Sequence, residues 1–304
     1  NEISMIFQEP MTSLNPLFTV GEQVAEVVRR HKKVSKERAW KRAIELLDLV
    51  KIANPEKKAL DYPFQLSGGQ RQRVMIAVAL ACEPKILIAD EPTTALDVTI
   101  QAEILALVNR LKDETGTAVM FITHDMAVVA QMADRVIVLY PGEKVEEGTV
   151  HEIFNNPKHE YTKSLLAAVP KLGEMASRKY PEPMRLMGKG DTKIIKPIIG
   201  TDEPILSVKK LVTRYSIRGG LFQRIKAKVH AVEDISFTIM KGKTLSLVGE
   251  SGCGKSTVGR SLIRLVEPAS GEVYLDGQNI LDLTLKDVRH ARSKIQMVFQ
   301  DPFA

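Results

Sequence analysis

Residues 249–256 read Gly249-Glu-Ser-Gly-Cys-Gly-Lys-Ser256, between a β-rich run, Thr244–Val248, and a helical stretch that starts at Lys255. A G-x-x-x-x-G-K-S turn between a strand and a helix is typical of a phosphate-binding loop. The glycines let the backbone curl so that its N–H groups face a phosphate, and the helix directs its positive end at the same anion. This strand–loop–helix unit predicts a nucleotide site in an α/β fold.

The residues of this loop have separate expected roles. Lys255 is expected to reach the β- and γ-phosphates, and the Ser256 hydroxyl to ligate Mg²⁺. The alternative is a glycine-rich turn with an accidental lysine. Cys253 is expected to be a small residue that the loop tolerates, with a redox role as the alternative. The predicted ATP-binding residues here are Gly249, Glu250, Ser251, Gly252, Cys253, Gly254, Lys255, Ser256 and Thr257.

A second group of candidates follows two other β-rich runs. The apolar run Ile86–Ala89 ends in Asp90 and Glu91. Asp90 suits the second shell of Mg²⁺ and Glu91 suits general-base activation of an attacking water, unless the pair only caps a following helix. His124 follows the run Ala118–Ile122, where it could sense a γ-phosphate or have a structural role at the strand end.

Strands and helices alternate in the middle of the chain, which indicates a parallel α/β sheet. The β-rich runs are Ile86–Ala89, Ala118–Ile122 and Arg135–Leu139, and the helical stretches between them are 97–113 and 125–133. Helical periodicity also covers 19–51, the stretch from the Leu66-Ser-Gly-Gly-Gln turn to Leu80, and 149–169.

The region from Pro170 to Pro204 has weak periodicity and is expected to be an interdomain linker. A second β-rich unit starts at Ile205, with strands expected at 205–214 and 229–239. The hexapeptide that starts at Met5 is repeated, with two changes, from Met297. Because the chain starts with Asn-Glu-Ile and stops soon after the second hexapeptide, we expect the sequence to be cut at both ends.

The composition excludes several classes of protein. Of 304 residues, 44% are hydrophobic and 26% charged, which is typical of a globular protein. The longest apolar run, Val74–Cys82, is too short to cross a bilayer. Two distant cysteines predict no disulfide framework or zinc cluster. The net charge of +6 is spread along the chain, apart from 29–33 and 218–228, which favours a solvated surface over nucleic-acid binding.

The phrase Leu66-Ser-Gly-Gly-Gln-Arg-Gln-Arg-Val74 resembles the signature of ATP-binding-cassette (ABC) ATPases, and other motifs of the family are present. Gln8 and Gln300 resemble the glutamine that contacts Mg²⁺, and Ala95-Leu-Asp97 resembles the D-loop that crosses between paired domains. Thr123-His124-Asp125 resembles the histidine switch. Tyr215 resembles the aromatic residue that stacks on adenine, with a surface tyrosine on a strand as the alternative.

The resemblance implies a P-loop NTPase (RecA-like) fold with a parallel sheet, an antiparallel β subdomain and a helical subdomain. It implies ATP and Mg²⁺ as cofactors and a head-to-tail pairing of cassettes. ATP would be clamped between one phosphate loop and a partner's signature, here Ser67, Gly68, Gly69 and Gln70. Free N–H groups at the start of a helix suit that contact with a γ-phosphate.

A narrower resemblance rests on Met11–Gly21 and Tyr161–Pro170, which look like the oligopeptide and dipeptide importer branch. The tandem order of motifs is similar to that of fused ATPases for glutathione import. This implies two integral membrane permease subunits and a solute-binding protein as partners, and a peripheral place at the cytoplasmic face of the inner membrane. Residues 171–204 contain no cysteine, so the iron–sulfur cluster of some relatives is not expected.

The predicted domains are 1–160, a first cassette from its Gln loop onward; 161–204, a terminal helix and linker; and 205–304, a second cassette up to its Gln loop. Two arrangements are open: a head-to-tail pair without a complete hydrolytic site, or one circularly permuted cassette in which Thr244–Val248 completes the sheet of 1–160. The alternatives to an importer ATPase are a non-transport cassette protein, acting in translation or DNA repair, and a nucleotide-binding fragment without turnover.

Overall fold

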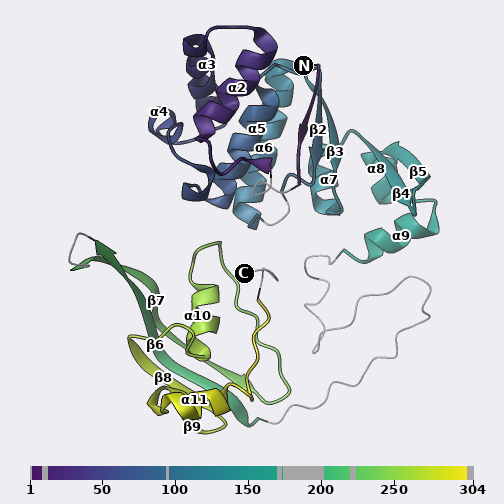
Figure 1. The fold of residues 1–304 in the computed structure, drawn as a ribbon. Helices are drawn as coiled ribbons and strands as arrows, with labels where there is room; N and C mark the ends of the chain where they lie inside the picture. Colours follow the sequence, from purple (N-terminus) through teal and green to yellow (C-terminus); the bar gives the residue numbers. More distant parts are fainter. Residues whose placement is uncertain are drawn as a thin grey trace. The chain divides into compact units, whose positions relative to one another are not determined.

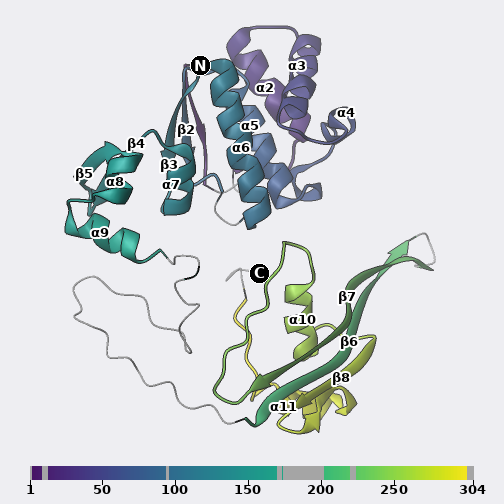
Figure 2. The same ribbon diagram turned by 180° about the vertical axis from the view of Figure 1, so that it is seen from behind.

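The structure is a computed structural model, and it describes residues 2–8, 13–93, 96–169, 173, 202–219 and 224–299. The chain divides into two compact units, Asn1–Lys193 and Ile194–Ala304, called unit 1 and unit 2 (Figures 1 and 2). Two predicted site residues, Gln300 and the Ala95 of the D-loop, lie outside the described residues.

Unit 1 is built on a three-stranded parallel sheet with the order β1-β2-β3. The sequence predicted a parallel sheet with strands at the positions of β2 and β3, but not β1 or the order of the strands. The strands are β1 (Ile3–Ile6), β2 (Ile86–Asp90) and β3 (Ala118–Ile122). Because all three run in the same direction, their carboxyl ends meet at one edge of the sheet. In the described part of the chain β3 is an edge strand, and its Met120 side chain is 58% exposed.

Helices cover this sheet and form the larger core. The helices before β2 are α2 (Val20–Lys32), α3 (Lys36–Leu49), α4 (Pro55–Lys58), the 3₁₀ turn η1 (Pro63–Gln65) and α5 (Gly68–Leu80). After β2 come α6 (Val98–Thr115) and, after β3, α7 (Met126–Met132). Helices α5 and α6 lie on one side of the sheet in both views (Figures 1 and 2), and Ile76, Leu87 and Val108 are buried together there.

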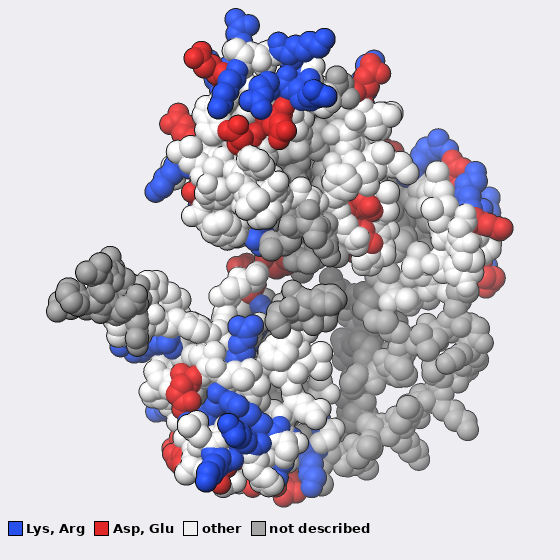
Figure 3. Space-filling model, in the orientation of Figure 1, with Lys and Arg blue, Asp and Glu red and all other residues white. Residues whose placement is uncertain are grey.

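The helical region predicted for 19–51 is a hairpin of two helices. Thr19 and Ser35 cap the starts of α2 and α3, because each side-chain oxygen accepts a backbone N–H of the first turn. Positive charge is favourable at the C-terminal end of a helix because of the helix dipole. The last turn of α2 carries the basic residues Arg29, Arg30, His31 and Lys32. Lys and Arg side chains gather over this end of unit 1 (Figure 3).

Two predictions for the end of unit 1 are wrong. β4 (Arg135–Tyr140) does not join the parallel sheet; it pairs antiparallel with β5 (Glu143–Thr149), since Gly142 at φ +89° permits a tight turn. The single helix expected over 149–169 is two helices, α8 (Val150–Asn155) and α9 (Glu160–Ala167). Pro157 lies in the break, and Glu146 accepts the N–H groups of Lys158 and His159 at 2.7 and 3.0 Å, which holds the chain outside a helix.

Unit 2 has an antiparallel sheet with the order β7-β6-β8-β9 and one face covered by helices. The strands are β6 (Pro204–Gly219), β7 (Arg224–Met240), β8 (Ser270–Leu275) and β9 (Gln278–Asn279). The helices are α10 (Lys255–Leu262), the 3₁₀ turn η2 (Ile280–Asp282) and α11 (Leu285–Ala291). Leu211 and Val273 are fully buried between them. None of the helices in the described residues of either unit could span a membrane.

The strand predicted for Thr244–Val248 is wrong. These residues have no regular secondary structure, and Val248 is 89% exposed. A strand before a phosphate loop needs parallel neighbours, and the described strands of unit 2 are all antiparallel.

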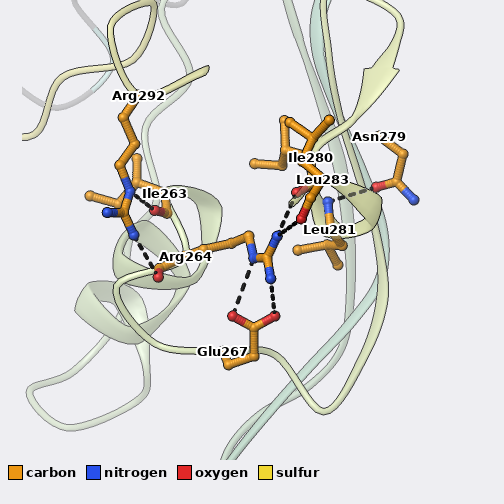
Figure 4. Close-up of polar contacts among 8 residues, drawn as sticks. All are labelled: Ile263, Arg264, Glu267, Asn279, Ile280, Leu281, Leu283 and Arg292. Atoms are coloured by element: carbon orange, nitrogen blue, oxygen red, sulfur yellow. Dashed lines mark hydrogen bonds and ion pairs between the residues drawn. The ribbon is translucent and has the colours of Figure 1, made fainter. Parts of the chain in front are cut away.

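Two arginines fasten the C-terminal end of α10 (Figure 4). Arg264 donates to the carbonyl oxygens of Ile280 and Leu283 at 3.2 and 2.8 Å, and it pairs with Glu267. Arg292 donates to the carbonyl oxygens of residues 263 and 264, both at 2.8 Å. The last carbonyls of a helix lack partners within it, so these charged bonds fix the C-terminal end of α10 against η2 and the end of α11.

Candidate nucleotide site

The glycine-rich loop of unit 2 has a backbone that only glycine allows at one position. Gly252 and Gly254 have φ values of +80° and +99°. A Cβ on Gly254 would lie 2.2 Å from the carbonyl oxygen of Ala231, in the backbone of β7. The loop can therefore rest on β7 only with glycine here, and this contact sets where α10 begins.

Lys255 folds back over the loop that precedes it. Its Nζ donates to the carbonyl oxygens of Gly249 and Glu250, both at 2.6 Å. The ammonium group thus lies inside the curl, close to the first turn of α10, so a positive side chain and a helix N-terminus point at the same space. A phosphate group fits these donors. The Cys253 Sγ lies 3.6 Å from the same Nζ.

The other predicted residues of this loop lie around the first turn of α10. Ser256 is exposed, and Thr257 Oγ1 lies 3.4 Å from the Tyr215 hydroxyl on β6. One bond that attaches the helix to the sheet was not predicted from the sequence, a buried contact of 2.9 Å between Thr213 Oγ1 and Ser261 Oγ. No sequence motif indicates this pair, because both residues are small and polar and lie in segments whose hydrophobic pattern predicts only core packing.

An ion pair lies next to Tyr215 on the β6–β7 arch. The Arg214 guanidinium donates to the Glu233 carboxylate at 2.7 and 2.9 Å and, with His230, lowers the pKa of Glu233 to about 2. This pair joins β6 and β7 at the residue before Tyr215, which itself lies at a register position opposite Val229.

Unit 1 holds the other group of predicted residues, at the carboxyl edge of its sheet. Asp90 ends β2, and Glu91 has a left-handed backbone with φ +43°, which costs free energy for a residue with a side chain. The Glu91 N–H donates to the carbonyl of Ile122 at 2.9 Å, which continues the ladder to β3. The turn of the backbone after Asp90 thus depends on the sheet.

Two predicted residues, Gln8 and His124, contact Glu91, and we call these three residues together the acidic edge. Gln8 Nε2, after β1, donates to Glu91 Oε2 at 2.8 Å. His124 Nδ1, after β3, lies 2.9 Å from Glu91 Oε1. An ionised carboxylate only accepts hydrogen bonds, so Nδ1 of His124 then carries the hydrogen. Each Glu91 oxygen therefore has a side-chain partner from a neighbouring strand end.

The predicted signature is the capped start of α5. Ser67 Oγ accepts the N–H of Gln70 at 3.3 Å, and Gln70 Oε1 accepts the N–H of Ser67 at 3.1 Å. This capping box leaves the tip exposed at Ser67. A Cβ on Gly69 would lie 2.7 Å from Ile100 Cγ2, so the glycine allows α5 to approach α6 closely. Asp97, the predicted D-loop residue, caps α6 through the N–H of Ile100 at 2.9 Å.

The described residues contain no group of three or more His, Cys, Asp or Glu side chains that could hold a metal ion. The predicted magnesium ligands are of another kind, a hydroxyl, a carboxylate and amide oxygens, which are the oxygen donors that Mg²⁺ takes alongside phosphate and water. Ser256 and, in unit 1, Asp90 and Gln8 fit that chemistry.

A family model described as ABC transporter matches residues 1–94 and 232–304, more than half of the chain. The chain belongs to the ABC transporter family. A second model, the C-terminal region of oligopeptide/dipeptide transporters, matches residues 145–187. The family and its α/β fold with parallel and antiparallel sheets, as the motifs predicted, are confirmed.

Curated relatives of this ABC chain are glutathione import ATP-binding proteins named GsiA. The protein from Salmonella choleraesuis (strain SC-B67) is 55% identical over 310 residues, which cover 100% of the chain and 49% of that protein. The protein from Escherichia coli (strain K12) is 54% identical over 308 residues, with the same coverage. The chain spans about half the length of these relatives. Among solved structures, the dimeric ATP-binding cassette MJ0796 bound to ADP and Pi is 38% identical, with a TM-score of 0.44. The match covers 49% of the present chain and 63% of the MJ0796 chain.

The region that matches the oligopeptide/dipeptide model, residues 145–187, belongs to unit 1 in its described part. Its described residues are the end of β5 and the helices α8 and α9, which Glu146 joins by its bonds to the backbone of Lys158 and His159. Tyr140 of β4 stacks on Tyr161 of α9, with 4.2 Å between the ring centroids. The described part of this region is therefore attached to the β4–β5 pair.

Proposed function

We propose that this chain is the ATP-binding and hydrolysing part of an ABC importer for peptides, with glutathione or di- and oligopeptides as the solute. The observation that carries the proposal is the acidic edge, where Gln8 and His124 both bind Glu91. A glutamate held on both oxygens at the end of the central strand β2 suits a general base for water. The identity to GsiA proteins and the oligopeptide/dipeptide region support peptide import.

The residues of the phosphate loop bind ATP in this proposal. Backbone N–H groups of 249–254 and the Lys255 ammonium hold the β- and γ-phosphates, and Tyr215 stacks on adenine. Ser256, Gln300, Gln8 and Asp90 would hold Mg²⁺, which neutralises phosphate charge when bound. To receive phosphate, Lys255 exchanges its bonds to the Gly249 and Glu250 carbonyls for bonds to phosphate oxygens.

The residues of the acidic edge perform hydrolysis. Glu91 takes the proton of the attacking water, while Gln8 and His124 hold the carboxylate in place and His124 contacts the γ-phosphate. The Ser67-Gly68-Gly69 tip, with Gln70 and the D-loop Asp97, meets the nucleotide on a partner cassette in head-to-tail pairing. Closure on ATP then drives the transport step.

The partners proposed are two integral membrane permease subunits and a solute-binding protein, with the chain held peripherally at the cytoplasmic face of the inner membrane. Nucleic acid is not proposed as a partner. This proposal is supported by the similarity to GsiA proteins, which are named for glutathione import, and by the oligopeptide/dipeptide region.

The test is made with a two-cassette protein of the relatives' length that carries this sequence, co-expressed with its membrane subunits. We expect the subunits to co-purify and ATP turnover to rise with the solute-binding protein loaded with glutathione or a short peptide. Turnover that responds to neither, in a preparation that binds ATP, would contradict peptide import. Absence of ATP binding would contradict the ATPase proposal itself.

We also propose the domain arrangement predicted from the sequence, with cassette parts at 1–160 and 205–304 and the segment 161–204 between them. One feature in each unit supports the permuted form. β3 is an edge strand in the described residues of unit 1, and Thr244–Val248 of unit 2 exposes apolar side chains without a strand partner. Parallel pairing of the two would remove apolar surface from water, at about 25 cal/mol per Å².

The permuted form predicts that the chain alone hydrolyses ATP, with a specific activity that does not depend on protein concentration. Lys255→Ala and Glu91→Gln should each abolish that activity. Activity that rises with concentration would indicate pairing between copies, and complete inactivity of a chain that binds ATP would contradict the permuted form.

A further inference from the structure

The first turn of α6 contacts two of the loops described above, and it does so with adjacent residues. Asp97 caps the helix, and Ile100 packs against Gly69 at the tip of α5. The next residue, Gln101, points to the loop after β3, where its Nε2 donates to Asp125 Oδ2 at 3.2 Å. No motif in the sequence singled out Gln101.

Asp125 is held from several directions. Its Oδ1 accepts the N–H of Ala127 at 2.9 Å and so caps α7, and its own N–H donates to Thr123 Oγ1 at 3.0 Å. Gln101 supplies the bond to the second carboxylate oxygen, from a residue 24 positions away. Of these three bonds, only the one from Gln101 ties the loop to another helix.

His124 lies between the two residues that these bonds fix, Thr123 and Asp125. Its side chain is 74% exposed, so packing does little to orient the ring. The direction of the ring is therefore set by the backbone of the loop and by the 2.9 Å contact with Glu91. A shift of the loop by a fraction of an ångström would lengthen that contact beyond hydrogen-bond distance.

We propose that Gln101 is a positioning residue for His124. Its bond to Asp125 holds the loop of residues 123–125 in the position in which Nδ1 of His124 contacts Glu91. Because Ile100 packs on Gly69 in the same helical turn, the bond also links the signature tip to the histidine. This inference rests on the proposed function of the acidic edge. It adds the connection by which binding of a partner at the signature would change the position of His124 against Glu91.

The experiment records ¹⁵N–¹H NMR spectra of the imidazole of His124 in the full chain. Gln101→Glu keeps the shape of the side chain and removes the N–H donor, and it places a carboxylate against Asp125. Gln101→Lys restores a donor. Gln131→Glu on α7 is the matched control, because Gln131 is exposed.

In the parent chain we expect the Nδ1–H tautomer, since Glu91 accepts that hydrogen. Gln101→Glu should move the two ring nitrogens toward averaged shifts and broaden the signals, while Gln101→Lys and Gln131→Glu should keep the parental pattern. Unchanged signals in Gln101→Glu would overturn the proposal, and so would an equal change in Gln131→Glu. A backbone spectrum of each variant shows that the chain is folded.

A second measurement separates this proposal from the proposed function. In the two-cassette protein, Gln101→Glu should lower kcat for ATP several-fold with an unchanged KM, because the phosphate loop is untouched, and Gln101→Lys should recover most of the kcat. An equal loss in kcat and gain in KM would overturn the positioning role. If the parent protein itself does not hydrolyse ATP, the proposed function fails, and the NMR spectra still decide the role of Gln101.

Discussion

The acidic edge of unit 1 and the phosphate loop of unit 2 are held by different kinds of bond. At the acidic edge, side chains from neighbouring strand ends bind one another, with Gln8 and His124 on the two oxygens of Glu91. In the phosphate loop, Lys255 binds backbone carbonyls of its own loop, and glycines set the path. The side chains of the first group thus bind one another across strand ends, whereas the Lys255 ammonium of the second group is bound within its own loop and must exchange these bonds for the phosphate contacts that we propose.

The largest effect is expected from Glu91→Gln in the two-cassette protein. The amide cannot take a proton from water, so turnover should fall by ~10²-fold or more, which corresponds to about 2.7 kcal/mol in activation free energy. Binding of ATP, measured by calorimetry, should stay within a factor of about three of the parent. Unchanged turnover would remove Glu91 from the catalytic role.

Lys255→Ala in the phosphate loop should lower the affinity for ATP, whereas Glu91→Gln should lower turnover and leave the affinity nearly unchanged. Loss of the ammonium removes charged hydrogen bonds to phosphate, each worth about 1.5–3 kcal/mol, so the affinity for ATP should fall about 10- to 100-fold. Calorimetric titration of the chain measures this loss. Arg260→Ala is the control, because Arg260 is an exposed basic residue on the same helix; equal losses would indicate a general effect of charge.

Gly254→Ala tests the backbone contact that places the phosphate loop. A Cβ there would meet the Ala231 carbonyl oxygen at 2.2 Å, at a φ of +99°, so unit 2 should lose about 2 kcal/mol or more of unfolding free energy. Gly277→Ala has a similar φ of +79° with no atom within 4 Å, and it should cost about 1 kcal/mol. Hydrogen exchange of β6 and β7 amides measures both. An equal cost at the two positions would show that the contact with β7 is unimportant.

Ser67→Ala and Ser35→Ala remove two helix caps of the same kind, with Oγ···N distances of 3.3 Å in each. Each should lower the unfolding free energy of unit 1 by about 1 kcal/mol, measured by hydrogen exchange. Only Ser67→Ala should also lower ATP turnover in the two-cassette protein. Equal turnover in both variants would count against a nucleotide contact at the tip of α5.

The smallest effect concerns the Arg214–Glu233 pair beside Tyr215. Since the pKa of Glu233 is lowered to about 2, the pair stabilises unit 2 above the ordinary carboxyl pKa, and this contribution is lost as the pH falls toward 2. The difference in melting temperature between the parent and Glu233→Gln should therefore be greatest near pH 6 and shrink below pH 4. A difference independent of pH would show that charge is not the cause.

Much of the acidic edge followed from the sequence, because parallel strands bring their carboxyl ends together. The runs before Glu91 and His124 were predicted within one residue of β2 and β3. Their meeting with Gln8 needed the register of β1, which four residues cannot reveal. β5 was not predicted because Glu143–Thr149 is largely polar and shows no alternation of apolar and polar residues. The strand prediction for Thr244–Val248 was wrong because strand formation depends on neighbouring strands, which a local pattern does not contain. Gln101 was missed because its partner lies in a different helix–loop unit.

The open side of β3 has a practical consequence for handling the chain. Among the described strands β3 is an edge strand with exposed apolar residues, here Met120 and Ile122, and such an edge can pair with an extended segment in solution. Unless Thr244–Val248 occupies this side as we propose, concentrated samples should be prone to strand-to-strand self-association through it. A lysine in place of Met120, which points away from the core, should delay precipitation on concentration without disturbing Glu91.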